Sequence, residues 1–360
     1  MSSSLQAFGA SLYFMNDKNI HDGLLAKRIT TDHMISILKN RGILVSAHST
    51  KNELLQMFKT IRFDYFEYVH LSALLENPNR KDSKSRTDIK EKVTINHINN
   101  AANNIKDKLK ETGAGVKVEA ISAKKILLKT SYLDIDYTRP PMRQKLRKTA
   151  IVEINIDGKT TNINYPATKM GKQLKEEIVS QAKESFGSDI EPIEIDFEFK
   201  PIKLRTDFFT RLISGIDGYD VFDVVSTCLK REGKESGEEK DEDFTGTVRN
   251  AVLTGRSVLT TKIYDSLPDE KYYIYKITWK IRYNDKSKGT DESDCYTIEA
   301  QFDESDKAKG FKYLVKSVQR YTQNKLNSST STVEKSKANE LSKLVYESAL
   351  KIYQNLNDGT

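Results

Sequence analysis

The sequence predicts an α+β protein, with a small amino-terminal helical unit followed by mostly antiparallel sheet packed with helices. Three observations support this prediction. Apolar residues recur at three-to-four spacing over residues 29–60, which is typical of amphipathic helices. From residue 116 onward, apolar and polar residues alternate, as they do in half-buried strands. The pair Asp157-Gly158 lies between two alternating runs and is a strong signal for a hairpin turn.

Length and composition are those of an ordinary folded protein. The chain has 360 residues, of which 37% are hydrophobic and 30% charged, enough for two or three domains and too apolar for wholesale disorder. No apolar run approaches the ~20 residues needed to cross a bilayer, and the first residues lack the basic segment of a secretory signal. With only Cys228 and Cys295, a disulfide scaffold is excluded. We therefore expect a cytoplasmic protein without a membrane partner.

The amino-terminal half is expected to begin with three helices. The first carries Met34, Ile37 and Leu38 on one face and ends near Gly42. The second begins at Thr50, since Thr50 and Glu53 have the spacing of a capping box. A short helix at 62–76, a linker at 77–88 and a longer helix at 89–112 follow. Strands are then expected from residue 116, within 126–137, and as the hairpin 151–165.

The remaining chain alternates between predicted helices and strands. Domains are expected at 1–76, 89–230 and 244–360, separated by the linker 77–88 and an acidic loop at 231–243. The expected helices are 169–186, one beginning at Thr206, 247–267, 307–323 and 333–356. The expected strands are 193–199, 221–229 and the antiparallel pair 271–283 and 295–302.

Charge is distributed unevenly along the chain. Residues 1–150 hold 26 Lys and Arg against 15 Asp and Glu, whereas residues 151–250 hold 14 against 21. The last 110 residues hold 18 against 15, which completes the net charge of +7. A polyanion is therefore expected to prefer the amino-terminal part. The alternative is a lysine-rich, well-solvated surface without a partner.

Residues 31–59 resemble the SAP and related helix–extension–helix motifs. The matching residues are Leu38 and Lys39, the link Arg41-Gly42-Ile43, and Lys51, Glu53, Leu54 and Leu55. Ala47-His48-Ser49 stands where the motif expects a glycine. The resemblance implies DNA binding through the second helix and the link, with Arg41 and Lys51 nearest to phosphates; free amides at a helix start also suit phosphate. A purely structural helical pair is the alternative.

A second basic feature is the run YTRPPMRQKLRK at 137–148, which contains no acidic residue. Pro140 and Pro141 favour an extended arm, and several basic side chains on such an arm would neutralise phosphates without reading bases. The residues expected to bind nucleic acid are Arg139, Arg143, Lys145, Arg147 and Lys148, with Lys124 and Lys125 joining from upstream. A solvated loop is the alternative.

The predicted strand KYYIYKITWKIRY at 271–283 separates aromatic from basic residues. Lys276, Lys280 and Arg282 share one face because strand side chains alternate. Trp279 belongs to the other face, which we expect to be core rather than a base-stacking platform. The basic row could touch a nucleic-acid backbone, or Glu299 on the partner strand could neutralise part of it.

An alternative function is a metal-dependent nuclease of the PD-(D/E)xK type. Glu198-Phe199-Lys200 matches the end of that pattern, and Asp189 or Asp157 could supply the upstream carboxylate needed to hold Mg²⁺. Any polar strand face in so charged a protein can also produce this tripeptide. The histidines show no zinc-ligand spacing.

The leading hypothesis is a non-catalytic protein or subunit that binds nucleic acid, most simply DNA, without a cofactor. We suggest a prokaryotic or phage defence system as its biological setting. A further alternative is an adaptor that docks a protein partner through its carboxy-terminal helices. The apolar face expected to do so comprises Leu341, Leu344, Val345, Ile352 and Leu356; helix packing inside the monomer is the alternative explanation for these residues.

Overall fold

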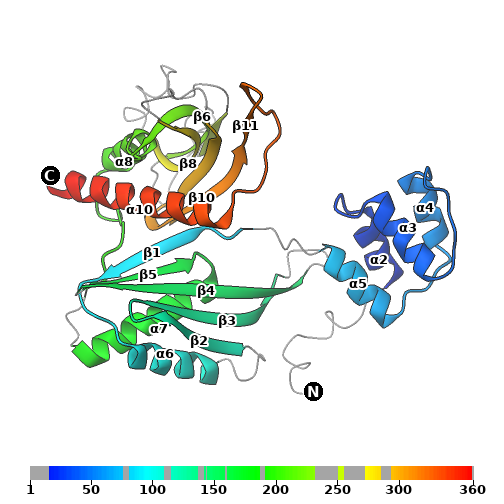
Figure 1. Cartoon of the computed structure of the whole chain (residues 1–360), viewed down its shortest axis with the longest axis horizontal. Coiled ribbons are helices and arrows are strands. Elements are labelled where there is room, and N and C mark those ends of the chain that lie inside the picture. The colour runs from blue at the N-terminus through cyan, green and yellow to red at the C-terminus, as the bar shows by residue number, and fades with distance from the viewer. Residues whose placement is uncertain are drawn as a thin grey trace, which may run out of the picture. The chain divides into compact units, whose positions relative to one another are not determined.

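The computed structural model describes residues 16–75, 81–108, 115–136, 142, 144–158, 160–186, 191–231, 250–254, 272–284 and 293–358. Over these residues it has eight helices, a ten-stranded antiparallel sheet and a two-stranded ribbon, with four helices preceding the sheet (Figure 1). This architecture confirms the predicted α+β class. The chain divides into two compact units, Met1–Arg80 with Thr94–Ile151 and Lys81–Val93 with Val152–Thr360. The expected domain boundaries differ from this division.

The first unit begins with helices α2 (Asp17–Leu25), α3 (Thr31–Asn40), α4 (Lys51–Phe58) and α5 (Tyr65–Leu75). Thr50 and Glu53 form the predicted capping box at the start of α4. Gly42, which follows α3, has a φ of 76°, a left-handed conformation that favours glycine. The helices enclose a small core that also includes Met142 and is centred on Leu24, Met34, Leu38, Leu54 and Leu71.

The same unit continues with α6 (Ile95–Lys108), β2 (Gly115–Ser122), β3 (Lys125–Ile135) and the first part of β4 (Lys145–Asp157). Helix α6 buries Ile98, Ala101 and Ile105. It begins later than the predicted helix 89–112, because residue 89 already belongs to a strand. In the ten-stranded sheet, β2 is one of the two edge strands and pairs with β3.

The second unit contains β1 (Lys84–Ile89), the end of β4, β5 (Thr160–Pro166), β6 (Tyr219–Arg231), β7 (Asn250–Thr254), β8 (Tyr272–Tyr283), β9 (Cys295–Glu304) and β10 (Lys309–Gln319). Their order is β4-β5-β1-β10-β9-β8-β6-β7. The small ribbon is β11 (Tyr321–Thr322) with β12 (Lys325–Leu326). Asp157-Gly158 forms the predicted turn between β4 and β5, with Gly158 at φ 60°.

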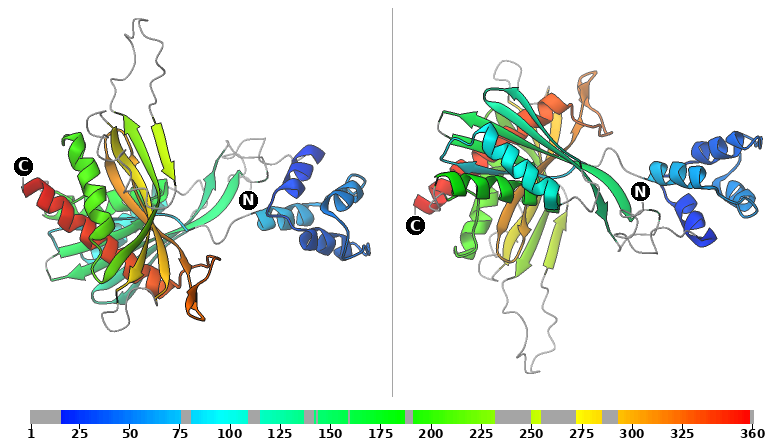
Figure 2. Two further views of the ribbon diagram at one scale, coloured as in Figure 1. Left: turned by 90° about the horizontal axis from the view of Figure 1, so that it is seen from above. Right: turned by 90° about the horizontal axis from the view of Figure 1, so that it is seen from below.

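Three helices cover the sheet of the second unit. Helices α8 (Ile202–Ser214) and α10 (Lys335–Asp358) pack against β8 and β10, respectively, and against each other (Figure 2). Helix α7 (Lys169–Phe186) packs against β5. The core beneath α8 and α10 includes the fully buried Phe208 and Trp279. Ile277, Trp279 and Ile281 lie in this core, as expected for that face of the strand, whereas Tyr283 at its end is 49% exposed.

Several expected elements differ from the structure. Residues 84–88 of the expected linker belong to β1, which lies between β5 and β10. The expected helix 307–323 is replaced mainly by β10, where Phe311, Tyr313 and Val315 point into the core. Within the expected helix 247–267, residues 250–254 form β7. The expected strand 193–199 is an irregular segment that bridges Asp88 through Ile193 and ends in a turn, where Phe199 is 93% exposed.

The acidic loop expected at 231–243 lies outside the described residues except for Arg231, which ends β6. Cys228 and Cys295 are both free thiols. In the described part of the chain, no helix has the length and apolar character needed to span a membrane.

Candidate nucleic-acid interface

Arg41 of the SAP-like unit is engaged within the protein. Its guanidinium donates hydrogen bonds to the Glu67 carboxylate and to the Arg62 carbonyl oxygen. These contacts join the link after α3 to the start of α5. The hydrogen bond from Arg41 also lowers the pKa of Glu67. Arg41 therefore has a structural role in this conformation, in addition to any contact with phosphate.

Lys51 is also engaged, at the carboxyl end of α2. Its Nζ donates hydrogen bonds to the carbonyl oxygens of Ala26 at 2.9 Å, Ile29 at 2.7 Å and Leu25 at 3.3 Å. Burial lowers the pKa of this lysine. The last carbonyl groups of a helix lack intrahelical donors and carry partial negative charge, so an ammonium group stabilises them.

We expect Lys51→Met to lower the free energy of unfolding by about 1–3 kcal/mol, because three carbonyl groups lose a charged donor. Urea unfolding followed by circular dichroism measures this change. Lys27→Met removes the same charge at an exposed position and should change stability by less than about 0.5 kcal/mol. Equal stability of the two variants would contradict the role assigned to Lys51.

The basic run at 137–148 is only partly described. Arg139 and Arg143 lie outside the described residues; Lys145 and Arg147 lie in β4, and their side chains are not described. Lys148 forms an ion pair with Asp134, with 2.6 Å between Nζ and Oδ2. Residues 145–148 thus form a strand rather than an arm. Lys124 is exposed in the turn between β2 and β3, and Lys125 begins β3.

The nuclease pattern does not form a cluster of acidic groups in the described part of the chain. The Glu198 carboxylate pairs with Lys309 and, at 3.6 Å, with Lys307, and the hydrogen bond from Lys309 lowers its pKa. Asp189 lies outside the described residues. Among the described residues, no group of three or more His, Cys, Asp or Glu could hold a metal ion.

The carboxy-terminal apolar face is buried inside the second unit, so internal packing, and not docking of a partner, accounts for it. Leu341 and Val345 are fully buried and Leu356 is 5% exposed, all in the core beneath α10. Leu344 and Ile352 pack against the same core. Packing of α10 on the sheet therefore accounts for these side chains.

A basic surface lies on the face of β8, β9 and β10 opposite α8 and α10. On β9, Ile298, Ala300 and Phe302 point into the core, so Glu299 and Gln301 point to the other face. Strand register places Lys276 of β8 and Lys312 of β10 on either side of Gln301. Lys280 lies opposite Thr297, and Arg282 lies opposite Cys295, on this same face. We call it the basic sheet face.

Glu299 lies at the centre of the basic sheet face between two lysines. Its carboxylate accepts a hydrogen bond from Lys316 at 2.9 Å and forms an ion pair with Lys276 at 3.1 Å. Burial alone would raise the pKa of Glu299, but the hydrogen bonds from Lys316 and Lys276 outweigh it and lower the pKa. The pairing of Glu299 with Lys276 confirms the neutralisation expected from the sequence, although one carboxylate here serves two ammonium groups.

Asp303, at the end of β9, repeats this arrangement. Its carboxylate pairs with Lys312 of β10 and with Lys172 of α7. Burial opposes its ionisation, yet the two lysine hydrogen bonds lower the pKa of Asp303. Both carboxylates stay ionised near neutral pH. Each of them neutralises only one of its two lysines, so one positive charge remains at each group.

Lys280 and Arg282 extend the basic sheet face toward β6. The Lys280 ammonium donates to the neutral Gln319 side chain at 2.9 Å, so this pair keeps its positive charge. The Arg282 guanidinium lies 4.0 Å from the ring centroid of Phe222, a β6 residue that is 46% exposed. Asp223 lies opposite Lys280 in the strand register.

The basic sheet face thus gathers six cations around three carboxylates. The cations are Lys172, Lys276, Lys280, Arg282, Lys312 and Lys316, and the acids are Asp223, Glu299 and Asp303. Sequence reasoning found the three cations of β8. It missed Lys172 of α7 and the two lysines of β10. Lys312 and Lys316 were missed because their segment was expected to be helical; the alternation of Phe311, Tyr313 and Val315 was the available signal.

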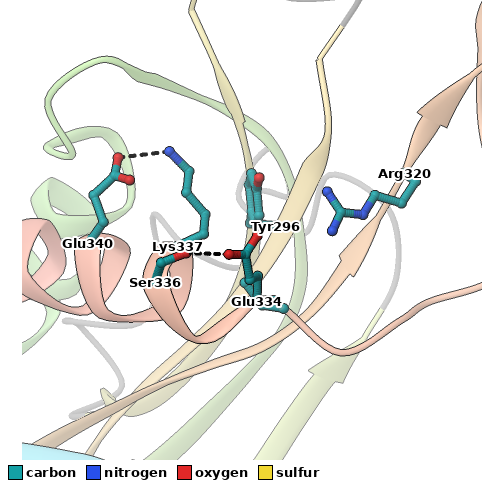
Figure 3. Close-up of a pocket in the computed structure, with 7 residues that line it drawn as sticks. Tyr296, Arg320, Glu334, Ser336, Lys337 and Glu340 are labelled. Atoms are coloured by element: carbon teal, nitrogen blue, oxygen red, sulfur yellow. Dashed lines mark hydrogen bonds and ion pairs between the residues drawn. The ribbon is translucent and has the colours of Figure 1, made fainter.

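A pocket of about 220 Å³ lies beside the start of α10 (Figure 3). Its lining residues are Tyr296, Arg320, Val333, Glu334, Ser336, Lys337 and Glu340. Burial would lower the pKa of Lys337, but hydrogen bonds with Glu340 and Tyr219 raise it. Arg320 pairs with Asp294 at 2.6 Å. Both cations of this pocket are therefore balanced by neighbouring acids, in contrast to those of the basic sheet face.

The sequence matches no known protein-family model and no curated protein. The fold and the site together describe an α+β protein. Helices cover one face of β8–β10, and a cluster of cations lies on the other face.

Proposed function

We propose that this protein binds nucleic acid without acting on it chemically, and that the phosphate backbone lies on the basic sheet face. The observation that carries the proposal is the excess of positive charge on one face of β8, β9 and β10. Phosphate neutralisation by Lys and Arg provides most of the affinity in sequence-independent binding. The lysines of this face are partly exposed; the side chain of Lys316 is 43% exposed and that of Lys276 is 29% exposed.

The basic run at 137–148 and Lys124 with Lys125 remain proposed contributors in the first unit. Arg41 and Lys51 contribute less to the proposal, because both side chains already hold helix ends together. The basic sheet face therefore carries the proposal, with the 137–148 run as its second element.

The quadruple variant Lys276→Gln/Lys280→Gln/Glu299→Gln/Lys316→Gln tests the basic sheet face. It replaces the central ion pairs with neutral amides that can still hydrogen bond, which avoids leaving Glu299 buried without a cation. We expect affinity for a fluorescent 20-nucleotide strand or duplex to fall about tenfold or more at low salt. The slope of log K against log salt should decrease by about two, since fewer counterions are released. Fluorescence anisotropy at several salt concentrations measures both.

Two controls test whether the effect depends on the position of the removed charges and on their sign. Lys343→Gln/Lys351→Gln removes the same net charge from exposed positions of α10, on the opposite side of the strands, and should leave affinity nearly unchanged. Glu299→Gln alone frees two lysines from their carboxylate and should strengthen binding. If the quadruple variant and the α10 variant behave alike, the basic sheet face does not bind nucleic acid.

A further inference from the structure

Phe222 is an exposed aromatic residue within the basic sheet face. It lies at an irregularity in the β6–β8 pairing, between Val221 and Asp223, which pair with Ile281 and Lys280. An extra residue at such a bulge is not confined to the strict alternation of a strand. The ring remains 46% exposed while Arg282 lies 4.0 Å from its centroid.

The two residues form a layered stack. Arg282 is itself only 7% exposed, and its guanidinium lies over the Phe222 ring. One side of the ring contacts a fixed cation, and the exposed part of the ring faces solvent. Nucleobases stack on aromatic side chains, and a neighbouring arginine adds a cation–π contribution, so an exposed ring held beside a guanidinium suits an unpaired base.

The basic sheet face is too wide to enter the major groove of a duplex. Four neighbouring strands spaced at ~4.8 Å span roughly 14 Å before side chains are added. The major groove of B-DNA is only ~12 Å wide and admits a helix or a two-stranded ribbon. A face formed by β10, β9, β8 and β6 therefore cannot enter the groove, and the bases of a duplex are out of its reach.

From these features we propose that the basic sheet face binds single-stranded nucleic acid, with a base stacked on Phe222 and the adjoining phosphates on Lys280, Lys276 and Lys316. This inference rests on the proposed function and narrows its ligand to unpaired strands. In a single strand the bases are free to turn toward an aromatic ring while the backbone follows the lysines.

Phe222→Leu tests the stack, because leucine keeps an apolar side chain but has no ring face. We expect it to weaken binding of a dT20 and of an rU20 strand about tenfold, with no change for a 20-base-pair duplex. Comparing the two strands shows whether DNA or RNA is preferred. Val252→Ala is the matched control, since Val252 is an apolar residue of the neighbouring edge strand and is 61% exposed.

Phe222→Trp provides a second, direct measurement. The natural chain has one tryptophan, Trp279, which is fully buried. A change in tryptophan fluorescence on binding would therefore come mainly from the new indole at position 222. Addition of dT20 should quench the fluorescence of the indole at position 222, because a base stacks on it. The Phe222→Trp variant should bind dT20 with the affinity of the natural protein. Because position 222 is exposed, this substitution and Phe222→Leu should both leave the fold intact.

The outcomes separate the two proposals. Single-strand binding that is unchanged in Phe222→Leu, with no quenching in Phe222→Trp, would overturn the stack but not nucleic-acid binding. Tighter binding of the duplex than of the single strands would overturn the ligand class alone. Absence of binding to every probe would overturn both proposals.

Discussion

Arg86→Leu is expected to lower the free energy of unfolding by about 3–5 kcal/mol, because it leaves the Asp88 carboxylate buried without its cation. Arg86 and Asp88 lie on β1, between β5 and β10, and their side chains are each 12% exposed. The guanidinium contacts both carboxylate oxygens, at 2.6 and 3.2 Å, and lies 4.8 Å from the ring centroid of the buried Tyr346.

The pH dependence of this variant identifies the cause. Burial raises the pKa of Asp88, and the hydrogen bonds from Arg86 oppose that rise. A folded-state pKa above the unfolded value means that Asp88 favours folding at low pH and loses this contribution as pH rises through the folded pKa. Without Arg86 the pKa should rise further. The stability deficit of Arg86→Leu relative to the natural protein should therefore become smaller as the pH falls from about 7 to about 4.

Urea unfolding at several pH values measures both effects. The double variant Arg86→Leu/Asp88→Leu removes both charges and should recover most of the loss, since replacing a whole buried ion pair with apolar groups is often neutral. A deficit below about 1 kcal/mol at pH 7, or one that does not vary with pH, would contradict this account of β1.

Phe208→Ala is expected to cost about 3–5 kcal/mol of unfolding free energy, through lost burial and the cavity it leaves. Phe208 is fully buried on α8, and its ring lies within 6 Å of four others. Those rings belong to Phe197, Phe209, Phe302 and Phe311, from a loop, the same helix and two strands. The side chain thus connects α8 to the sheet.

Fluorescence of Trp279 reports this unfolding, because the single tryptophan of the chain is buried in the same core. Phe199→Ala is the matched control; it makes the same chemical change at a site that is 93% exposed, and should alter stability by less than about 0.5 kcal/mol. Similar losses in the two variants would show that Phe208 does not pack as described.

Elements governed by local chemistry could be predicted from the sequence. The capping box of Thr50 and Glu53, the end of α3 just before Gly42 and the Asp157-Gly158 turn all form where they were expected. Helix α7 has the predicted bounds, 169–186. In each case the stabilising contacts lie within a few residues along the chain, so the pattern alone carries the information.

Elements whose burial depends on distant partners were predicted less well. β1 contains Lys84, Arg86 and Asp88 and has the composition of a linker. It becomes an inner strand because Asn339 and Tyr346 of α10 contact its polar side chains. In β10, Phe311, Leu314 and Val318 fit helical spacing, whereas Phe311, Tyr313 and Val315 fit a strand, and pairing with β9 selects the strand.

For the candidate site, the sequence by itself determined the α+β class, the shared face of Lys276, Lys280 and Arg282, and the partner Glu299. Tertiary structure alone decided which cations are available to a ligand. Arg41 and Lys51 bind carboxylate and carbonyl oxygens of their own unit. Lys312 and Lys316 come beside β8 only through the intervening β9. The reason is physical: a charge is available or neutralised according to neighbours that folding brings from far along the chain.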